Sequence, residues 1–340
     1  MIRLDLARCR VFHRVVVCSA GGMLLMMGWL LYACEVAAVE PAASADAPKK
    51  IEPKKETMHL FTVPSYCEGV VFDHAGNGYV SWGKTITRFT LDGKHEPWVE
   101  TGAPNGHKVL ADGTHLVCDA SRHAVLHLDA QGKMLDPASK ESDGKPLRGP
   151  NDLTLDTPNG GFYFSDPGDS SAEKPIGTVH YVDKDGKTHL VDEGLAFPNG
   201  IVLTSDGKKL LLAESQKNRV LAYEVKSPGK LGPRTVFAEL PKKDTAAGQI
   251  DNQPDGMCLD ADGNLYVAHY GMKQVQVLDP AGKLIARYDG GNVTTSNVAF
   301  GGPNMDQLFI TGGLGIEQGK GGVFRIDVGV KGLVILPKME

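Results

Sequence analysis

The chain has 340 residues, a net charge of −5 and 23% charged residues. This balance excludes the strong basic excess that marks many nucleic-acid-binding proteins, and we expect no nucleic-acid partner. Glycine and proline, with 41 and 20 residues, are more frequent than in an average protein. That frequency fits many tight turns and is too low for collagen. The length allows either two average domains or one large barrel or propeller.

The N-terminus has the pattern of an export signal. Four arginines within the first fourteen residues precede an uncharged apolar run over residues 15–33. Ala43-Ser44-Ala45 offers small residues for cleavage, and Cys34 offers a lipid attachment site. The third alternative is an uncleaved membrane anchor. All three predict that the rest of the protein is periplasmic or secreted and contacts a membrane only through this leader or its lipid. The leader spans residues 1–45 and is followed by a linker at 46–58.

The rest of the sequence is built from a repeated strand–turn–strand unit. Apolar runs flank turns such as Asp92-Gly93, Asp206-Gly207 and Asp262-Gly263, which are strong hairpin signals. Second strands begin near residues 79, 116, 162, 210, 265 and 308, at spacings from 37 (79 to 116) to 55 (210 to 265) residues. Such spacings are typical of propeller blades. We therefore predict an all-β, six-bladed β-propeller as a single domain (residues 59–336), with residues 60–63 completing the last blade.

Oxygen-bearing side chains recur just before the first strand of each repeat. Glu68, Asn105, Asn151, Asn199 and Asp255 occupy this position in five repeats, and Ser296-Asn297 occupies it in the sixth. Since the first strands surround the propeller channel, these side chains should meet at one of its mouths. Carboxylates and amides suit Ca²⁺, Mg²⁺ or Mn²⁺ better than a structural zinc. Asn-Gly and Asp-Gly are also common turn dipeptides, but the shared register, and Glu68 as a poor turn former, favour a metal site.

The cysteines outside the leader show neither a metal-binding spacing nor a disulfide pattern. Cys67, Cys118 and Cys258 are widely separated and odd in number. We expect them to be small buried residues, and the alternative is that one pair forms a disulfide in an oxidising compartment.

These motifs resemble one known family. Gln253–Asp260, Phe197–Gly200, Gly149–Asp152, Phe300–Pro303 and Glu68-Gly69 are similar to segments of the SMP-30/gluconolactonase/LRE-like family. The resemblance implies a six-bladed propeller with one divalent cation in its channel, Ca²⁺ being favoured and Mg²⁺, Mn²⁺ or Zn²⁺ being alternatives.

The same resemblance suggests roles for individual residues. Glu68, Asn199 and Asp255 would be the main metal ligands, Asn151 a further ligand or a substrate-orienting group, and Asn105 a pocket residue. Family members often carry an arginine two residues before the Asn151 position. This chain has glycine there, and Arg148, one residue further away, is the substrate-binding candidate.

The chemistry expected of such a site is hydrolysis of a lactone, a small sugar-derived substrate. A divalent ion polarises a carbonyl and activates water, Asp255 (or Glu68) would orient or deprotonate that water, and Asn151 would hold a substrate oxygen. His269 is a further substrate-binding candidate and His107 a secondary site candidate, and for both a structural role is the alternative. Neither a Gly-x-Ser-x-Gly nor a His-Glu-x-x-His motif is present. The competing hypothesis is a non-catalytic extracytoplasmic propeller that binds a ligand or a protein around a structural metal.

Overall fold

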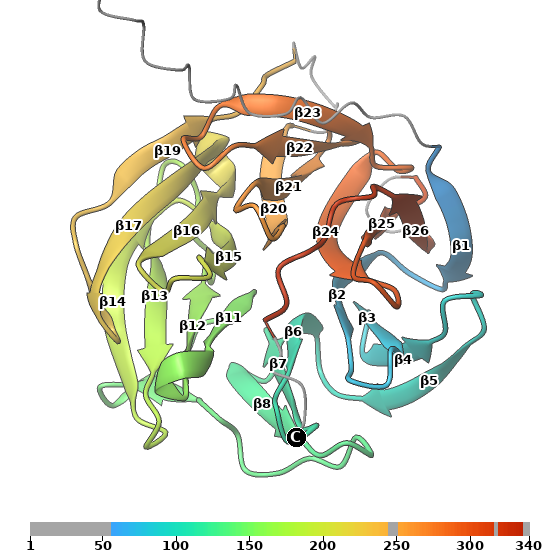
Figure 1. Cartoon of the computed structure of the whole chain (residues 1–340). Coiled ribbons are helices and arrows are strands. Elements are labelled where there is room, and N and C mark those ends of the chain that lie inside the picture. The colour runs from blue at the N-terminus through green and yellow to red at the C-terminus, as the bar shows by residue number, and fades with distance from the viewer. Residues whose placement is uncertain (1–55, 244–250, 316–318, 336–340) are drawn as a thin grey trace, which may run out of the picture. The chain divides into compact units, whose positions relative to one another are not determined.

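The computed structural model describes residues 56–243, 251–315 and 319–335, which form a six-bladed β-propeller around a central channel (Figure 1). This confirms the predicted fold class. The predicted leader and all but the last residues of the predicted linker lie outside the described residues. None of the helices in the described part of the chain has the length and apolar character that a membrane crossing requires.

The blades follow one another along the chain. Their strands, from the channel outward, are β2 (Cys67–Phe72), β3 (Gly78–Trp82), β4 (Thr85–Phe89) and β5 (His95–Glu100); β6 (Pro104–Val109), β7 (His115–Asp119) and β8 (Ala124–Leu128); β11 (Leu153–Asp156), β12 (Gly161–Asp166), β13 (Gly177–Val182) and β14 (Thr188–Leu195); β15 (Pro198–Leu203), β16 (Lys209–Glu214), β17 (Arg219–Ser227) and β19 (Thr235–Glu239); β20 (Gln253–Leu259), β21 (Leu265–Tyr270), β22 (Gln274–Leu278) and β23 (Leu284–Asp289); and β24 (Thr294–Gly301), β25 (Gln307–Gly313), β26 (Gly321–Asp327) and β1 (Met58–Val63).

Shorter elements decorate this frame. They are the hairpin of β9 (Glu141–Ser142) and β10 (Lys145–Pro146), strand β18 (Lys230–Leu231), and the 3₁₀ turns η1 (Thr157–Asn159) and η2 (Ser215–Lys217). In the second blade, residues following β8 take the place of a regular outer strand, with isolated bridges from Val125 to Ser139 and from Leu128 to Met134.

The two ends of the described chain close the propeller in the last blade. Strand β1 pairs antiparallel with β26, so the N-terminal strand becomes the outermost strand of the sheet that begins with β24. This is the closure that the sequence predicted. It ties the first blade to the sixth by backbone hydrogen bonds.

The hairpin turns are held by a repeated aspartate. Asp260 Oδ1 accepts hydrogen bonds from the main-chain N–H groups of Asp262 (3.0 Å) and Asn264 (2.8 Å), and its Oδ2 accepts from the Tyr266 hydroxyl at 3.4 Å. Gly263 has a φ of +82°, which a glycine adopts without strain. Asp73, Asn77 and Tyr79 repeat the arrangement in the first blade. The aspartate therefore satisfies the turn's backbone donors and fixes the hairpin.

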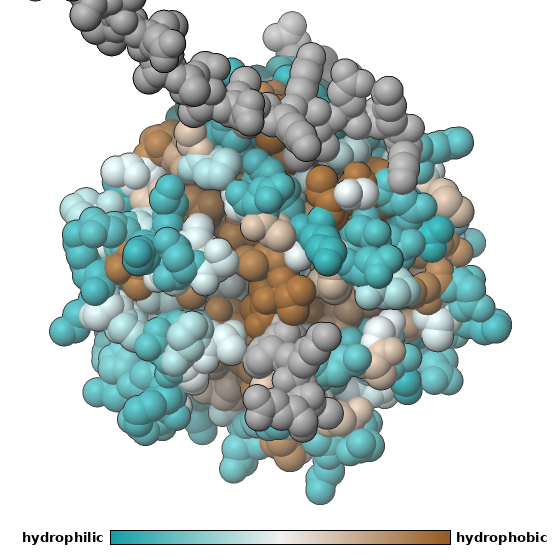
Figure 2. All heavy atoms as spheres, viewed as in Figure 1, coloured by the Kyte–Doolittle hydropathy of each residue, from teal (hydrophilic) through white to brown (hydrophobic). Residues whose placement is uncertain are grey.

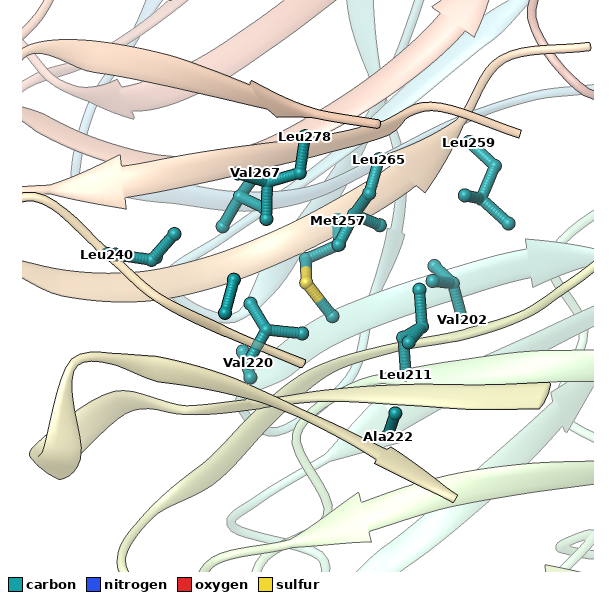
Figure 3. Packing of buried hydrophobic residues seen from close by; sticks show 12 residues of the cluster. Val202, Leu211, Val220, Ala222, Leu240, Met257, Leu259, Leu265, Val267 and Leu278 are labelled. Atoms are coloured by element: carbon teal, nitrogen blue, oxygen red, sulfur yellow. The ribbon is translucent and has the colours of Figure 1, made fainter. Parts of the chain in front are cut away.

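The core lies between the blades. In Figure 3, Val202 and Leu211 of the fourth blade face Met257 and Leu265 of the fifth. All four side chains are at most 4% exposed. Because burying one such side chain is worth about 1.5–3 kcal/mol, neighbouring blades hold one another in register.

The cysteines of the propeller are free thiols, as expected. Cys67 and Cys118 are buried, and Cys258 is half-buried. The Cys67 thiol donates to the carbonyl oxygens of Gly312 and Gly322.

A C-terminal strap, residues 328–335, crosses the end of the channel at which the innermost strands finish (Figure 1). The Leu333 N–H donates to the Leu259 carbonyl at 2.9 Å, and the Ile335 carbonyl accepts from Thr157 Oγ1 at 3.3 Å. Leu333 packs on the core between the fourth and fifth blades, and Ile335 on that between the second and third. Figure 2 shows an apolar surface over the middle of this face. No pattern in the sequence predicted this cover.

Candidate metal and active site

The site is built where the innermost strands begin, at the end of the channel opposite the strap. Five of these strands carry a β-bulge there, because their pairing registers shift between Cys67 and Val70, Pro104 and His107, Pro198 and Ile201, Pro254 and Met257, and Thr295 and Asn297. A bulge re-aims side chains out of the regular pleat. Four of the bulges contain Glu68, Asn105, Asn199 and Asp255, while Asn151 lies two residues before the first residue of β11. We call these five residues the ring.

Glycines after the ring residues allow adjacent blades to touch. A Cβ atom on Gly69 would lie 2.2 Å from the Asn105 carbonyl oxygen, and one on Gly200 would lie 2.2 Å from that of Asp255. The Gly106 N–H donates to the Asn151 carbonyl at 2.8 Å. The ring residues therefore lie in neighbouring pairs around the channel, at distances that only a residue without a side chain permits.

Hydroxyl groups fix the backbone around the ring. The Thr311 hydroxyl donates to the Glu68 carbonyl at 2.7 Å, and the Ser81 hydroxyl donates to that of Asn105 at 2.9 Å. Ser215 donates to the Pro254 carbonyl, next to Asp255, at 2.6 Å. These bonds satisfy carbonyls at or next to bulges. These hydroxyl residues were not among the predicted site residues, although they recur at the end of the second strand or just after it.

Two carboxylates of the ring interact in a buried setting. Asp255 and Asn199 are only 7% and 6% exposed. Burial raises the pKa of Asp255 well above its ordinary value, and the negative charges of Glu68 and Asp152 raise it further. The Asn199 amide, which hydrogen-bonds to the Asp255 carboxylate, lowers it. Buried like charges are costly unless a cation offsets them, so this donor set fits a divalent ion.

An ion pair that the sequence analysis missed lies next to the ring. Lys108 Nζ is 3.8 Å from Asp152 Oδ1, and the Asp152 side chain is 3% exposed. Burial raises the pKa of Asp152, while Lys108 and the Leu153 N–H lower it. The available signal was a charged residue at each of two channel positions, Lys108 three residues after Asn105 and Asp152 directly after Asn151.

Two tyrosines also stand close to the ring. The rings of Tyr66 and Tyr270 are 6.4 Å apart and nearly perpendicular. Burial raises the pKa of Tyr66, as do the charges of Glu68 and Asp255, and its hydroxyl hydrogen-bonds to Ser296. The sequence signal for Tyr66 was its place two residues before Glu68.

The remaining candidates lie elsewhere. His269 has no exposed surface, and its ring nitrogens contact Asn218 at 2.8 Å and Gln276 at 3.2 Å. This placement gives His269 no free face for a substrate and corresponds to the structural alternative. His107 is 1% exposed and bonds to His115 at 2.8 Å.

Arg148 is exposed beside the third blade. Its main-chain N–H donates to Asp166 at 2.8 Å, and its guanidinium donates to the Ile176 carbonyl. The segment before β11, which includes Asn151, therefore holds Arg148 at the same end of the channel as the ring.

Comparison with protein families decides the relationship. The SMP-30/gluconolactonase/LRE-like region matches residues 9–313. The chain belongs to this family. Its relatives include the diisopropyl-fluorophosphatase of Loligo vulgaris (28% identity; 53% of this chain and 59% of that protein) and the pentonolactonase of Haloferax volcanii (27%; 71% and 81%). A lactonase drp35 of Staphylococcus saprophyticus is 32% identical over 72% of this chain and 77% of its own. The match thus spans less than two thirds of the squid enzyme.

Solved structures share the fold. A gluconolactonase from Xanthomonas campestris superposes with a TM-score of 0.68 at 24% identity, covering 80% of this chain and 89% of its own. Regucalcin from Agrobacterium tumefaciens, described as a calcium-binding protein, gives 0.69 at 22% identity, covering 84% and 98%.

Proposed function

We propose that this protein is a divalent-metal-dependent lactonase that opens a small, sugar-derived lactone. The observation that carries the proposal is the meeting of Glu68 and Asp255, two interacting carboxylates, with the Asn199 amide at one end of the channel. The named lactonases among its relatives support the reaction class.

The donor set determines which ion fits. Glu68, Asn199 and Asp255 would hold the cation, with Asn151 as a further ligand or a substrate-orienting amide. All four offer oxygen, which Ca²⁺ prefers and which Mg²⁺ and Mn²⁺ also accept. A bound divalent ion would supply electrophilic activation of the lactone carbonyl.

The chain's own side chains would handle the proton and the substrate. Asp255 is buried beside Asn199 where the cation would sit, so its carboxylate is placed to orient the attacking water or take its proton. The water oxygen bonds to the carbonyl carbon, the ring C–O bond breaks, and the proton passes to the departing alkoxide. The product is a hydroxy acid. Asn151, and Asn105 at the pocket wall, would hold substrate oxygens, with Arg148 as a further contact.

We propose that residues 1–45 export the protein or anchor it, so that the substrate is an extracytoplasmic lactone.

A proton-release assay separates the enzyme from a non-catalytic binding propeller. Hexonolactones and pentonolactones are supplied with and without EGTA, and Ca²⁺, Mg²⁺, Mn²⁺ or Zn²⁺ is then restored. Diisopropyl fluorophosphate is tested as a further substrate because a relative in Loligo vulgaris is a diisopropyl-fluorophosphatase. We expect lactone hydrolysis that EGTA abolishes and one metal restores. A folded, metal-loaded protein that is inert on every substrate would overturn the proposal in favour of the binding propeller.

A further inference from the structure

A single lysine stands in the layer of the channel next to the ring. Lys108 follows Asn105 by three residues on β6, and the side chains of Lys108 and Asn105 are both partly accessible. The residues at the same register in the other blades are uncharged, namely Val71, Thr154, Val202, Cys258 and Ala299. Within the described residues, Lys108 is thus the charged member of this layer.

The surroundings of Lys108 place its ammonium group inside the channel. It pairs with Asp152 of the third blade at 3.8 Å. Its positive charge also lowers the pKa of the Cys258 thiol, which belongs to the fifth blade and which burial otherwise raises. The charge of Lys108 therefore acts on groups of both the third and the fifth blade. Its side chain is only 19% exposed, so solvent screens the charge poorly.

The charges around the ring form a simple balance. Glu68, Asp255 and Asp152 contribute three negative charges, and Lys108 contributes one positive charge, which leaves −2. We propose that Lys108 fixes the charge of the metal ring at −2 by neutralising Asp152, and thereby sets its preference for divalent over trivalent cations. This inference rests on the metal site of the proposed function.

The charge of the ion makes this role measurable. The Coulomb energy between a fixed side-chain charge and a bound ion is proportional to the charge of the ion. If removal of the lysine charge strengthens Ca²⁺ binding about tenfold, it should strengthen Tb³⁺ binding about thirtyfold. The reason is that the logarithm of the change in affinity is proportional to the charge of the ion and is therefore half as large again for Tb³⁺. A lysine that only filled space would not change the ratio of the two affinities in this way.

The test measures Ca²⁺ and Tb³⁺ affinities of the EGTA-stripped full-length chain by calorimetry and terbium luminescence. We expect Lys108→Met to strengthen both in the stated proportion. Asp152→Asn, which leaves Lys108 without its partner, should weaken them about tenfold and thirtyfold. The double variant should return to within about threefold of the parent, and Lys108→Arg should match the parent.

Lys184→Met is the matched control, because it removes the same charge from an exposed pair with Asp185 at 2.8 Å. It should leave both affinities unchanged. Equal Ca²⁺ and Tb³⁺ effects in Lys108→Met, or no effect in either single variant, would overturn the role of Lys108 while leaving the metal site intact. If Lys108→Met does not fold, Asp152→Asn alone tests the role, because it should weaken both affinities where Lys108→Met would strengthen them. A parent that binds neither ion would instead overturn the proposed function itself and this inference with it.

Discussion

Gly200 is the residue at which the account can be tested by adding a single methyl group. In Gly200→Ala the new Cβ would lie 2.2 Å from the carbonyl oxygen of Asp255, whereas real Cβ contacts stay above 3.0 Å. The fourth and fifth blades must therefore separate by about 0.8 Å, the difference between these two distances. The backbone of Gly200 does not have a positive φ, so the clash is the dominant effect.

The expected loss follows from the rigidity of the contact. The obstacle is a main-chain carbonyl of an innermost strand, which cannot rotate away as a flexible side chain could. Overpacking of this kind costs about 1–3 kcal/mol of unfolding free energy. The same displacement pulls Asn199 away from Asp255, whose carboxylate it hydrogen-bonds. We expect Ca²⁺ affinity to fall at least about tenfold, because ligands for a cation must stay close to their preferred distances.

Urea unfolding and calcium titration of the same preparations provide the assay. Gly232→Ala is the control, because its added Cβ would meet Glu224 Cβ at an ordinary 3.5 Å. The control should keep the parent's stability and affinity. A Gly200→Ala variant that unfolds and binds Ca²⁺ like the parent would refute the claim that close blade contacts build the ring.

Two further predictions concern the frame. Burial lowers the pKa of His115 from 6.5 to about 4, so between these values the unfolded chain takes up a proton that the folded chain refuses. The stability that neutral His115 provides is complete above pH 6.5 and falls by about 3 kcal/mol as the pH approaches 4. His115→Gln should remove that part of the acid sensitivity, measured by urea unfolding at pH 7.5 and 5. The control variant His59→Gln, at an exposed position, should keep the parent's pH dependence. An unchanged pH dependence in His115→Gln would contradict the assignment. Ending the chain after residue 327 removes the C-terminal strap with Leu333 and Ile335 and should lower the free energy of unfolding by about 3 kcal/mol. A melting curve equal to that of the parent would show that the strap does not stabilise the channel end.

The fold was predictable because its signals are local and repeated. Aspartate–glycine turns such as Asp262-Gly263 between apolar runs mark hairpins, and six copies at blade spacing leave few other architectures. The ring register was readable for the same reason, since Asn199 and Asp255 stand at equivalent points of their repeats.

Features that depend on contacts between distant residues were not readable. The strap has no periodic pattern, and its role appears only when Leu333 and Ile335 meet cores built from other blades. Lys108 and Asp152 stand at recognisable channel positions of their repeats, but their contact forms across two blades and could not be inferred from their sequence separation. His269 looked available beside a ring residue, but its partners Asn218 and Gln276 come from elsewhere in the fold and bury it.

The central claim is most directly tested by Asp255→Asn, which removes one ring charge while keeping the size of the side chain. Divalent-ion binding and lactone hydrolysis should be measured on the same folded sample, beside the parent. We predict that the parent binds one ion per chain and hydrolyses a lactone only when that ion is present. The variant should lose ion binding and at least about a hundredfold in kcat/KM, with its unfolding curve retained. A variant that turns over lactone like the parent, or a parent unaffected by chelation, would contradict the assignment of the ring as the catalytic site.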